Sequence, residues 1–265
     1  MRRRLSCTAT VSLCVLAVLA GMVGRSSAAE QQKIRVLITT GGHDFDRKGF
    51  FAMWDLFPDI AWREGKMEKS GEAFTAENLK DCDVLVTYDM AQKITDEQKA
   101  ALDDFLKRGG GLVALHHSIA SWQDWPEWER IIGVKYFLKP ETREGKQYPP
   151  SGYKHDVDMR VHIADPKHPI TRGLSDFDIH DETYNGYLVN PKVHVLLTTD
   201  SPTSDKNIGW VRQEDKARVA FIQLGHDDKA YTNPNYKKLV ERAVEWAAGR
   251  IGKKSEGKSK KAKES

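Results

Sequence analysis

The sequence predicts an α/β fold with a mostly parallel central sheet, and three short apolar stretches carry that prediction. Residues 33–40, 82–88 and 112–115 lack the polar alternation of a half-exposed strand, so each is expected to be covered on both faces. Stretches with helical periodicity separate them. Buried strands that alternate with helices are typical of a sandwich in which helices cover both faces of a parallel sheet.

The connecting segments of the first half have recognisable helix signals. A helix is expected over residues 47–57, capped by Asp46, and a short strand and a weak helical turn are expected over 60–63 and 75–79. Thr95 to Gln98 reads as a capping box that opens another helix, and the glycines at 109–111 end it. The chain then enters the central strand at 112–115.

In the second half the pattern changes to one of antiparallel strands. Residues 157–163 alternate apolar and polar, as a half-exposed strand does. Before this strand, a short helix is expected from Pro126 to Ile132, and a polar excursion over 140–154 is expected to be either a lid or a disordered loop. After it, a strand is expected over 193–198 and a hairpin is expected to pair 208–211 with 218–224. Asn233 is expected to cap a final helix. We therefore expect one domain, residues 30–250, with an antiparallel addition to its parallel sheet.

The first 29 residues have the pattern of an export signal. Three arginines precede a mostly apolar run over residues 5–23, and small residues at 26–29 suit cleavage; an uncleaved membrane anchor is the alternative. The prediction is an exported, periplasmic or extracellular protein with no membrane segment after cleavage. Cys7 and Cys14 would leave with the signal, so Cys82 would be the one cysteine of the mature chain, a small buried thiol that forms no internal disulfide.

The net charge of +3 is unevenly distributed. Subtracting the four arginines before residue 30 and the net +4 after residue 250 leaves −5 for the body of the chain. An acidic body does not suit a nucleic-acid partner. The Lys-rich tail, residues 251–265, is expected to be disordered; it either serves solubility or contacts a polyanionic surface, which leaves a scaffold role open.

Polar groups with catalytic potential follow the predicted strands. They are His43, the pair His116 and His117, the group Asp181, Glu182 and Tyr184, and the pair His226 and Asp227. Because chemistry in open parallel sheets collects beyond the carboxyl ends of the strands, these groups are expected to share one rim. His168 and His194 lack this placement and are expected to be structural or exposed.

Several kinds of chemistry are compatible with such a set. Carboxylate and imidazole groups can transfer protons near neutral pH, and the same groups from separate strands could hold a divalent transition metal, which stays open. A serine triad at Ser118 is disfavoured, because no glycine-flanked elbow surrounds it. The tryptophans at 122, 125 and 128 either pack in the core or form the wall of a sugar pocket.

Four motifs together resemble the ThuA-like (trehalose utilisation) family. They are Gly41-Gly42-His43, residues 109–116, Asp181-Glu182-x-Tyr184 and Gly225-His226-Asp227, and the resemblance runs from about Lys33 to Ala248. It implies a flavodoxin-like, class I glutamine amidotransferase-like three-layer sandwich. The histidine after the central strand stands where related amidotransferases carry a nucleophilic cysteine, so the chain is not expected to be a cysteine-dependent amidotransferase.

The resemblance also implies a role in carbohydrate metabolism, with trehalose, related disaccharides or 3-keto sugar derivatives as the substrate class. Within that frame we assign His116 and Glu182 as the acid–base pair, Tyr184 as proton donor or anchor, and His226, oriented by Asp227, as the group that completes the site. Substrate-binding roles are expected for Gly42, His43, His117, Trp122, Asp181 and Asp227. The alternative is a non-catalytic carbohydrate-binding domain.

Overall fold

The computed structural model describes residues 32–67 and 73–252. The predicted export signal, and all but the first two residues of the predicted tail, lie outside the described residues. Within the described part, no helix has both the length and the apolar character needed to cross a membrane. Cys82 is buried, its thiol donates a hydrogen bond to the carbonyl of Val84, and burial raises its pKa to about 11, so this thiol is unreactive.

A nine-stranded sheet runs through the described residues, and its first half is parallel. The strand order in this half is β2, β1, β3, β4, β13. The five strands are β2 (Ile60–Lys66), β1 (Ile34–Gly41), β3 (Val84–Asp89), β4 (Gly111–Leu115) and β13 (Ala217–Ile222). Their side chains are buried almost throughout, except at β2 on the edge, which explains the continuous apolar runs of the sequence.

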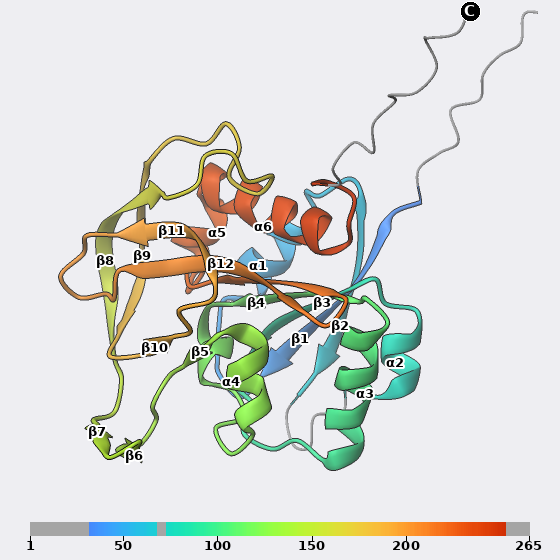
Figure 1. Cartoon of the computed structure of the whole chain (residues 1–265). Helices are drawn as coiled ribbons and strands as arrows, with labels where there is room; N and C mark the ends of the chain where they lie inside the picture. The colour runs from blue at the N-terminus through green and yellow to red at the C-terminus, as the bar shows by residue number, and fades with distance from the viewer. Residues whose placement is uncertain (1–31, 68–72, 253–265) are drawn as a thin grey trace, which may run out of the picture. The chain divides into compact units, whose positions relative to one another are not determined.

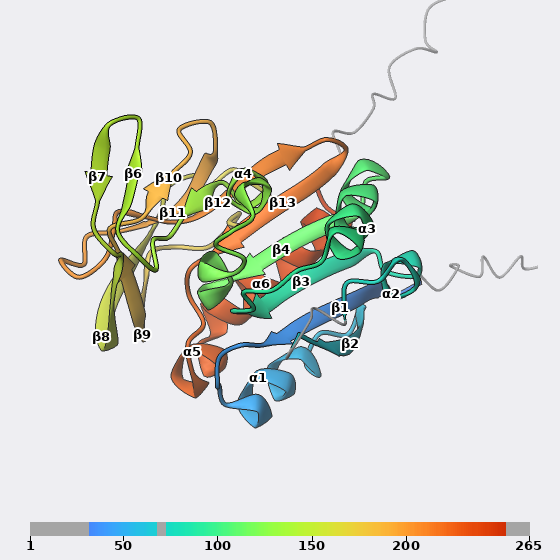
Figure 2. The ribbon, with the colours of Figure 1, turned by 90° about the horizontal axis from the view of Figure 1, so that it is seen from below.

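The second half of the sheet is antiparallel and continues from β13. Its strands are, in order, β12 (Asn207–Glu214), β11 (His194–Thr199), β8 (Gly152–Ile163) and β9 (Phe177–Asn185). Figure 2 shows this half standing to one side of the parallel strands. Two short pairs accompany it: β5 (Val134–Lys135) with β10 (Leu188–Val189), and β6 (Glu141–Arg143) with β7 (Lys146–Tyr148).

Helices cover both faces of the parallel half, which makes three layers (Figure 1). On one face lie α1 (Arg47–Trp54), α5 (Asp228–Thr232) and α6 (Pro234–Ala247). On the other lie α2 (Ala76–Lys80), α3 (Asp96–Lys107) and α4 (Pro126–Ile132). The predicted α/β class, with a mostly parallel sheet and an antiparallel addition, is confirmed.

The apolar stripes of the two longest helices explain how they dock. In α6, Leu239, Val240 and Val244 are fully buried, and each such side chain contributes about 1.5–3 kcal/mol by leaving water. Asn233 caps this helix through the N–H groups of Asn235 and Tyr236. The capping box at Thr95 and Gln98 is present at the start of α3, as predicted.

Two local predictions need correction, and one short helix was not predicted. The helix expected over 47–57 ends at Trp54, and the N–H groups of Leu56 and Phe57 bond to the third residue back, as in a tightened last turn. The excursion over 140–154 is not a disordered loop: it forms the β6–β7 hairpin, in which Arg143 pairs with Glu129, and then enters β8. The short 3₁₀ helix η1 (His116–Ala120), which follows the central strand, has no counterpart in the sequence prediction.

Candidate active site

The carboxyl ends of the parallel strands bring four histidines to one rim. His43 follows β1, His116 and His117 follow β4, and His226 follows β13. The rings of His43 and His117 are stacked with centroids 4.8 Å apart, and the centroids of His116 and His226 are 5.4 Å apart. The parallel topology thus gathers the imidazoles that the sequence placed at separate strand ends.

The backbone at this rim is tightly constrained. Gly42 has φ = +75°, and a Cβ there would lie 2.6 Å from the carbonyl carbon of Met90. Gly225 has φ = +114°, and a Cβ there would lie 2.0 Å from the hydroxyl oxygen of Tyr236. His116 adopts φ = +46°, which costs on the order of 1–3 kcal/mol for a residue with a side chain. The strained turn directs its imidazole out of the strand, toward β9.

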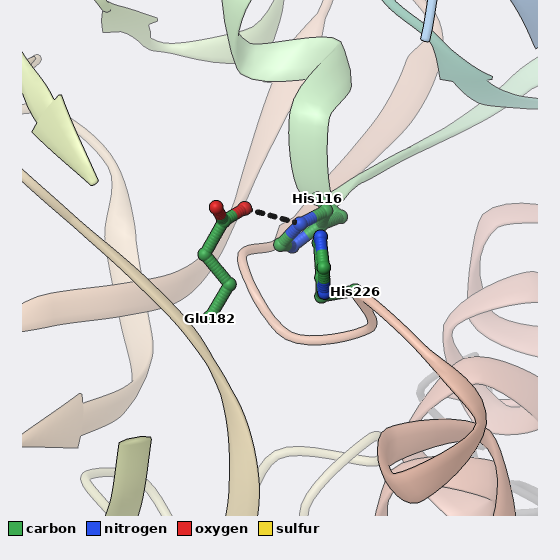
Figure 3. A group of neighbouring side chains, drawn as sticks. All are labelled: His116, Glu182 and His226. Carbon is green, nitrogen blue, oxygen red and sulfur yellow. Dashed lines mark hydrogen bonds and ion pairs between the residues drawn. The ribbon is translucent and has the colours of Figure 1, made fainter. Parts of the chain in front are cut away.

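Strand β9 of the antiparallel half supplies the carboxylate. Glu182 Oε2 lies 3.0 Å from His116 Nε2, and the hydroxyl of Tyr184 lies 2.8 Å from the same nitrogen. Figure 3 shows Glu182, His116 and His226 converging from three separate segments of the chain. The predicted partners do meet, but Glu182 and Tyr184 lie within an antiparallel strand and not at the end of a parallel one.

Two acceptors fix the orientation of the His116 ring. Its Nδ1 donates to the carbonyl of Gln223 at 2.6 Å, so Nε2 is left to face Glu182 and Tyr184. Burial alone would lower the pKa of His116, but the hydrogen bond to Glu182 and the negative charges of Asp181 and Glu182 outweigh burial and raise it. The contacts with Glu182 and Asp181 therefore stabilise the protonated form of this imidazole.

Glu182 is the matching anion. Burial opposes its charge, but the hydrogen bond and positive charge of His116 and a hydrogen bond from Tyr184 lower its pKa to about 2. Its other oxygen, Oε1, lies 2.9 Å from His155 Nδ1. The pKa of His226 is lowered by burial and by the charge of His116, which favours its neutral form.

His155 is a residue that the sequence analysis missed. It lies near the start of β8, where the register with β9 shifts between Lys154 and Val157 and Asp156 has φ = +55°. Its ring also lies 4.8 Å from that of His226, between centroids. The sequence does not mark His155 as a site residue, because it is a lone histidine in a polar segment. The irregular pairing of β8 with β9, which directs its side chain toward the cluster, exists only in the folded sheet.

A cavity of about 260 Å³ opens onto this cluster. Its lining is part polar and part apolar: His43, His117, His155, Glu182 and Tyr184, with Met90, Ile119, Ala120, Tyr136, Leu138 and Tyr153. Leu138 and Tyr153 are among the large apolar side chains that stay exposed. A second hollow of about 530 Å³, which includes Gly42, Arg47 and Lys66, adjoins the first at His43. Both lie within the size range of small-molecule sites or just below it, about 300–1,000 Å³.

One predicted substrate contact, Trp122, lies in the core. Trp122 is buried among Phe74, Trp125 and Trp128 and does not line the cavity, because the three tryptophans pack against one another and the core. Ser118 is also fully buried. His194 pairs with Asp165 at the surface and His168 is half-buried beside it, as expected of structural residues.

Asp181 and Asp227, two further predicted substrate contacts, do not line the cavity; their carboxylates accept hydrogen bonds from backbone N–H groups. The carboxylate of Asp181 is buried and accepts from the N–H groups of Glu182, Gly225 and His226, at 2.7–2.9 Å. It therefore joins β9 to the loop that carries His226. Asp227 caps α5 through the N–H of Lys229, and its carboxylate is 3.8 Å from His226 Nδ1, too far for a hydrogen bond that would orient the ring.

Known proteins extend this description to the level of the family. The family model for ThuA, described as trehalose utilisation, matches residues 33–247. No curated protein matches the chain. Among solved structures, a ThuA-like protein from Parabacteroides merdae ATCC 43184 is 17% identical with a TM-score of 0.70, and covers 85% of this chain and 94% of its own.

Two further solved structures share the fold. A ThuA-like protein from Bacteroides uniformis ATCC 8492 is 18% identical with a TM-score of 0.62, and the match covers 84% of this chain and 94% of that one. A cytoplasmic protein from Salmonella typhimurium LT2 is 12% identical with a TM-score of 0.60, over 81% of this chain and 99% of that one. At these identities the likeness concerns the fold alone.

Proposed function

This chain belongs to the ThuA family, whose role lies in carbohydrate metabolism, and we propose that it cleaves a disaccharide or 3-keto-glycoside by acid–base catalysis. The observation that carries the proposal is the buried ion pair of His116 and Glu182, in which Glu182 lines a cavity of about 260 Å³. A buried proton donor next to a buried anion is the arrangement that general acid–base catalysis needs.

The substrate class follows from what one such pair can do. A carbonyl at C3 of a sugar acidifies the proton at C2, and loss of that proton allows the C1–O bond to break with formation of a C1=C2 double bond. Glu182 would take the C2 proton and His116 would give its Nε2 proton to the departing oxygen, which leaves as an alcohol. Addition of water to the C1=C2 bond then completes hydrolysis.

The geometry of the pair supports this division of roles. The low pKa of Glu182 depends on the charge and hydrogen bond of His116. When His116 gives its proton away, the pKa of Glu182 therefore rises. The burial of Glu182 then favours its protonated carboxyl form. The 3.0 Å separation between Nε2 and Oε2 lets the proton return to His116 afterwards. Tyr184, 2.8 Å from Nε2, is placed to hold the departing or the carbonyl oxygen.

The cavity suits one sugar ring. Tyr136 and Tyr153 offer aromatic faces and His43 and His155 offer hydrogen-bonding groups, a combination typical of carbohydrate sites. An exported location stays part of the proposal, since the predicted signal precedes the described domain.

The test is to incubate the purified protein with 3-keto-trehalose and with trehalose and to follow the release of a reducing sugar. We expect release from the keto substrate, and its loss in His116→Ala and in Glu182→Gln. Full turnover in either variant would contradict the assigned pair. Saturable binding of a disaccharide without any product would support the non-catalytic binder instead.

A further inference from the structure

The group of His116, Glu182 and His226 has the composition and convergence of a metal site. One ligand atom from each residue, two imidazole nitrogens and one carboxylate oxygen, lies within 4.8 Å of the other two. Two histidines and one carboxylate are a common donor set for Zn²⁺ and for divalent iron, and they leave positions open for a substrate. We infer that these three residues bind one divalent transition-metal ion next to the cavity that Glu182 lines.

The first argument is the spacing. Ligands 2.0–2.2 Å from a metal ion lie roughly 3.0–3.5 Å from each other in tetrahedral or octahedral geometry. The separation of His116 Nε2 and Glu182 Oε2, 3.0 Å, already falls at the edge of that range. The widest pair would have to approach by a further 1 Å or so, a movement that the half-buried ring of His226 can make by rotation about its side-chain bonds.

The second argument is the support behind each ligand. Histidines that bind metals usually donate their other ring N–H to a carbonyl or carboxylate, which fixes the tautomer and directs the free nitrogen at the ion. His116 does this through Nδ1 and the carbonyl of Gln223, at 2.6 Å. That contact is independent of the spacing of the three ligands, and it prepares Nε2 to act as a neutral donor.

Hydrogen bonds also support the other two ligands: they join strand β9, which carries Glu182, to the loop that carries His226. Asp181, next to Glu182 in β9, accepts from the N–H groups of Gly225 and His226 at 2.7 and 2.9 Å. This buried carboxylate therefore fixes the distance between the backbone of Glu182 and that of His226 before any ion arrives. Pre-organised ligands of this kind lower the cost of ordering on binding.

A further imidazole is available at the open side. His155 Nδ1 lies 2.9 Å from Glu182 Oε1, and its ring is half exposed in the cavity. It can hold the free carboxylate oxygen or enter the coordination shell as a fourth donor. Because Glu182 and His155 both line the cavity, a sugar oxygen would approach the ion from their side, as a site with vacant positions requires.

The ion and the proton between His116 and Glu182 would be alternative occupants of one position. Metal binding therefore does not depend on the proposed cleavage, and the two are measured separately. Turnover of 3-keto-trehalose is recorded with the metal-free and with the metal-loaded protein. Its absence in both would overturn the catalytic proposal and would leave the metal inference unaffected.

The test uses the full chain without an affinity tag, stripped of metal by a chelator and titrated with Co²⁺ and with Zn²⁺. We expect one equivalent to bind, with the visible absorption bands of nitrogen- and oxygen-bound Co²⁺, and displacement by Zn²⁺. His226→Ala and Glu182→Gln should each weaken Zn²⁺ binding at least tenfold while the thermal unfolding of the metal-free protein stays cooperative.

The matched control is His180→Ala. His180 lies on the same strand as Glu182, is partly exposed and contacts the carboxylates of Asp156 and Asp158, so it is the natural place for adventitious metal binding. The variant should retain the one-equivalent site. Loss of that site in His180→Ala, its persistence in His226→Ala, or no binding of Co²⁺ and Zn²⁺ at millimolar concentration would each overturn the inference.

Discussion

The two halves of the sheet contribute different things to the candidate site. The parallel half supplies imidazoles at strand ends, His43, His116, His117 and His226, on a backbone constrained by Gly42 and Gly225. The antiparallel half supplies the carboxylate, the phenol and a fifth imidazole from within β8 and β9. The comparison teaches that the parallel half provides the imidazole of the central ion pair, and that the added strands provide its carboxylate, Glu182.

The largest expected effect comes from removing the charge that the antiparallel half contributes. Glu182→Gln keeps the size of the side chain but cannot hold His116 in its protonated form or accept a proton. Cleavage of 3-keto-trehalose should fall about 10²–10⁴-fold, the usual contribution of a general acid–base group. The pKa of His116, followed by NMR of its ring, should fall at the same time, because the interaction that raises it is lost.

Glu144→Gln is the control for that change, since Glu144 is exposed in the β6–β7 turn and does not line the cavity. It should leave both turnover and the titration of His116 unchanged. If Glu182→Gln also retained turnover, the antiparallel half would be a structural addition and not a part of the chemistry.

The next largest effect should come from cutting the connection between the two halves. Asp181→Ala leaves the N–H groups of Glu182, Gly225 and His226, two of them buried and the third partly buried, without their acceptor. Hydrogen bonds to a charged group contribute about 1.5–3 kcal/mol each, with incomplete additivity, so the free energy of unfolding should fall by about 3 kcal/mol. Chemical denaturation measures this.

Asp178→Ala is the matched control on the same strand. Asp178 is exposed and its ion pair is with Arg160, so its loss should change the free energy of unfolding by less than about 1 kcal/mol. Equal effects of the two substitutions would mean that Asp181 does not join the halves.

The sequence predicted the parallel half better than the antiparallel half, for a physical reason. Strands buried on both faces are continuous apolar runs, so β1, β3 and β4 could be placed, and with them His43, His116 and His117. Strand β9 mixes Asp178, His180, Asp181 and Glu182 with apolar residues because one part is exposed and another lines the site. Such a segment has no clear period, so the sequence analysis placed Asp181, Glu182 and Tyr184 after a strand, whereas they lie within one.

The remaining misses concern what a side chain contacts after folding. Nothing in the sequence distinguishes a tryptophan that packs from one that forms the wall of a pocket, and Trp122 packs. Nor could the role of Asp181 be predicted, because two of its three partners are backbone N–H groups more than 40 residues away. His155 depends on the irregular register of β8 against β9, which only the assembled sheet defines.

A smaller effect is expected in the pH dependence of stability. The pKa of Glu182 is lowered from 4.5 to about 2, so its contribution is complete above pH 4.5 and is lost as the pH falls toward 2. The pKa of His116 is raised above 6.5, so its contribution is complete below pH 6.5 and is lost as the pH rises through the raised value. The pair should therefore stabilise the fold most between about pH 4.5 and 6.5.

Comparing the wild type with Glu182→Gln at each pH isolates this pair, since other carboxylates titrate in both proteins. The difference in the free energy of unfolding should be largest near pH 5.5 and should shrink by about 2 kcal/mol toward pH 2.5. A difference that stays constant from pH 2.5 to 8 would show that the two halves are not joined by an ion pair.

The smallest effect separates an aromatic residue that borders the cavity from one that lies beneath it. Tyr153 comes from the antiparallel half, lines the cavity and is 61% exposed, whereas Trp122 is 1% exposed in the core beside the parallel half. Tyr153→Ala should raise the KM for 3-keto-trehalose about three- to tenfold, consistent with roughly 1 kcal/mol for an aromatic contact, with little change in stability.

Trp122→Phe should have the opposite pattern of effects, lowering the free energy of unfolding by about 1–2 kcal/mol and leaving KM unchanged. Steady-state kinetics and denaturation of both variants check this, and a rise in KM confined to Trp122→Phe would assign substrate binding to the parallel half after all.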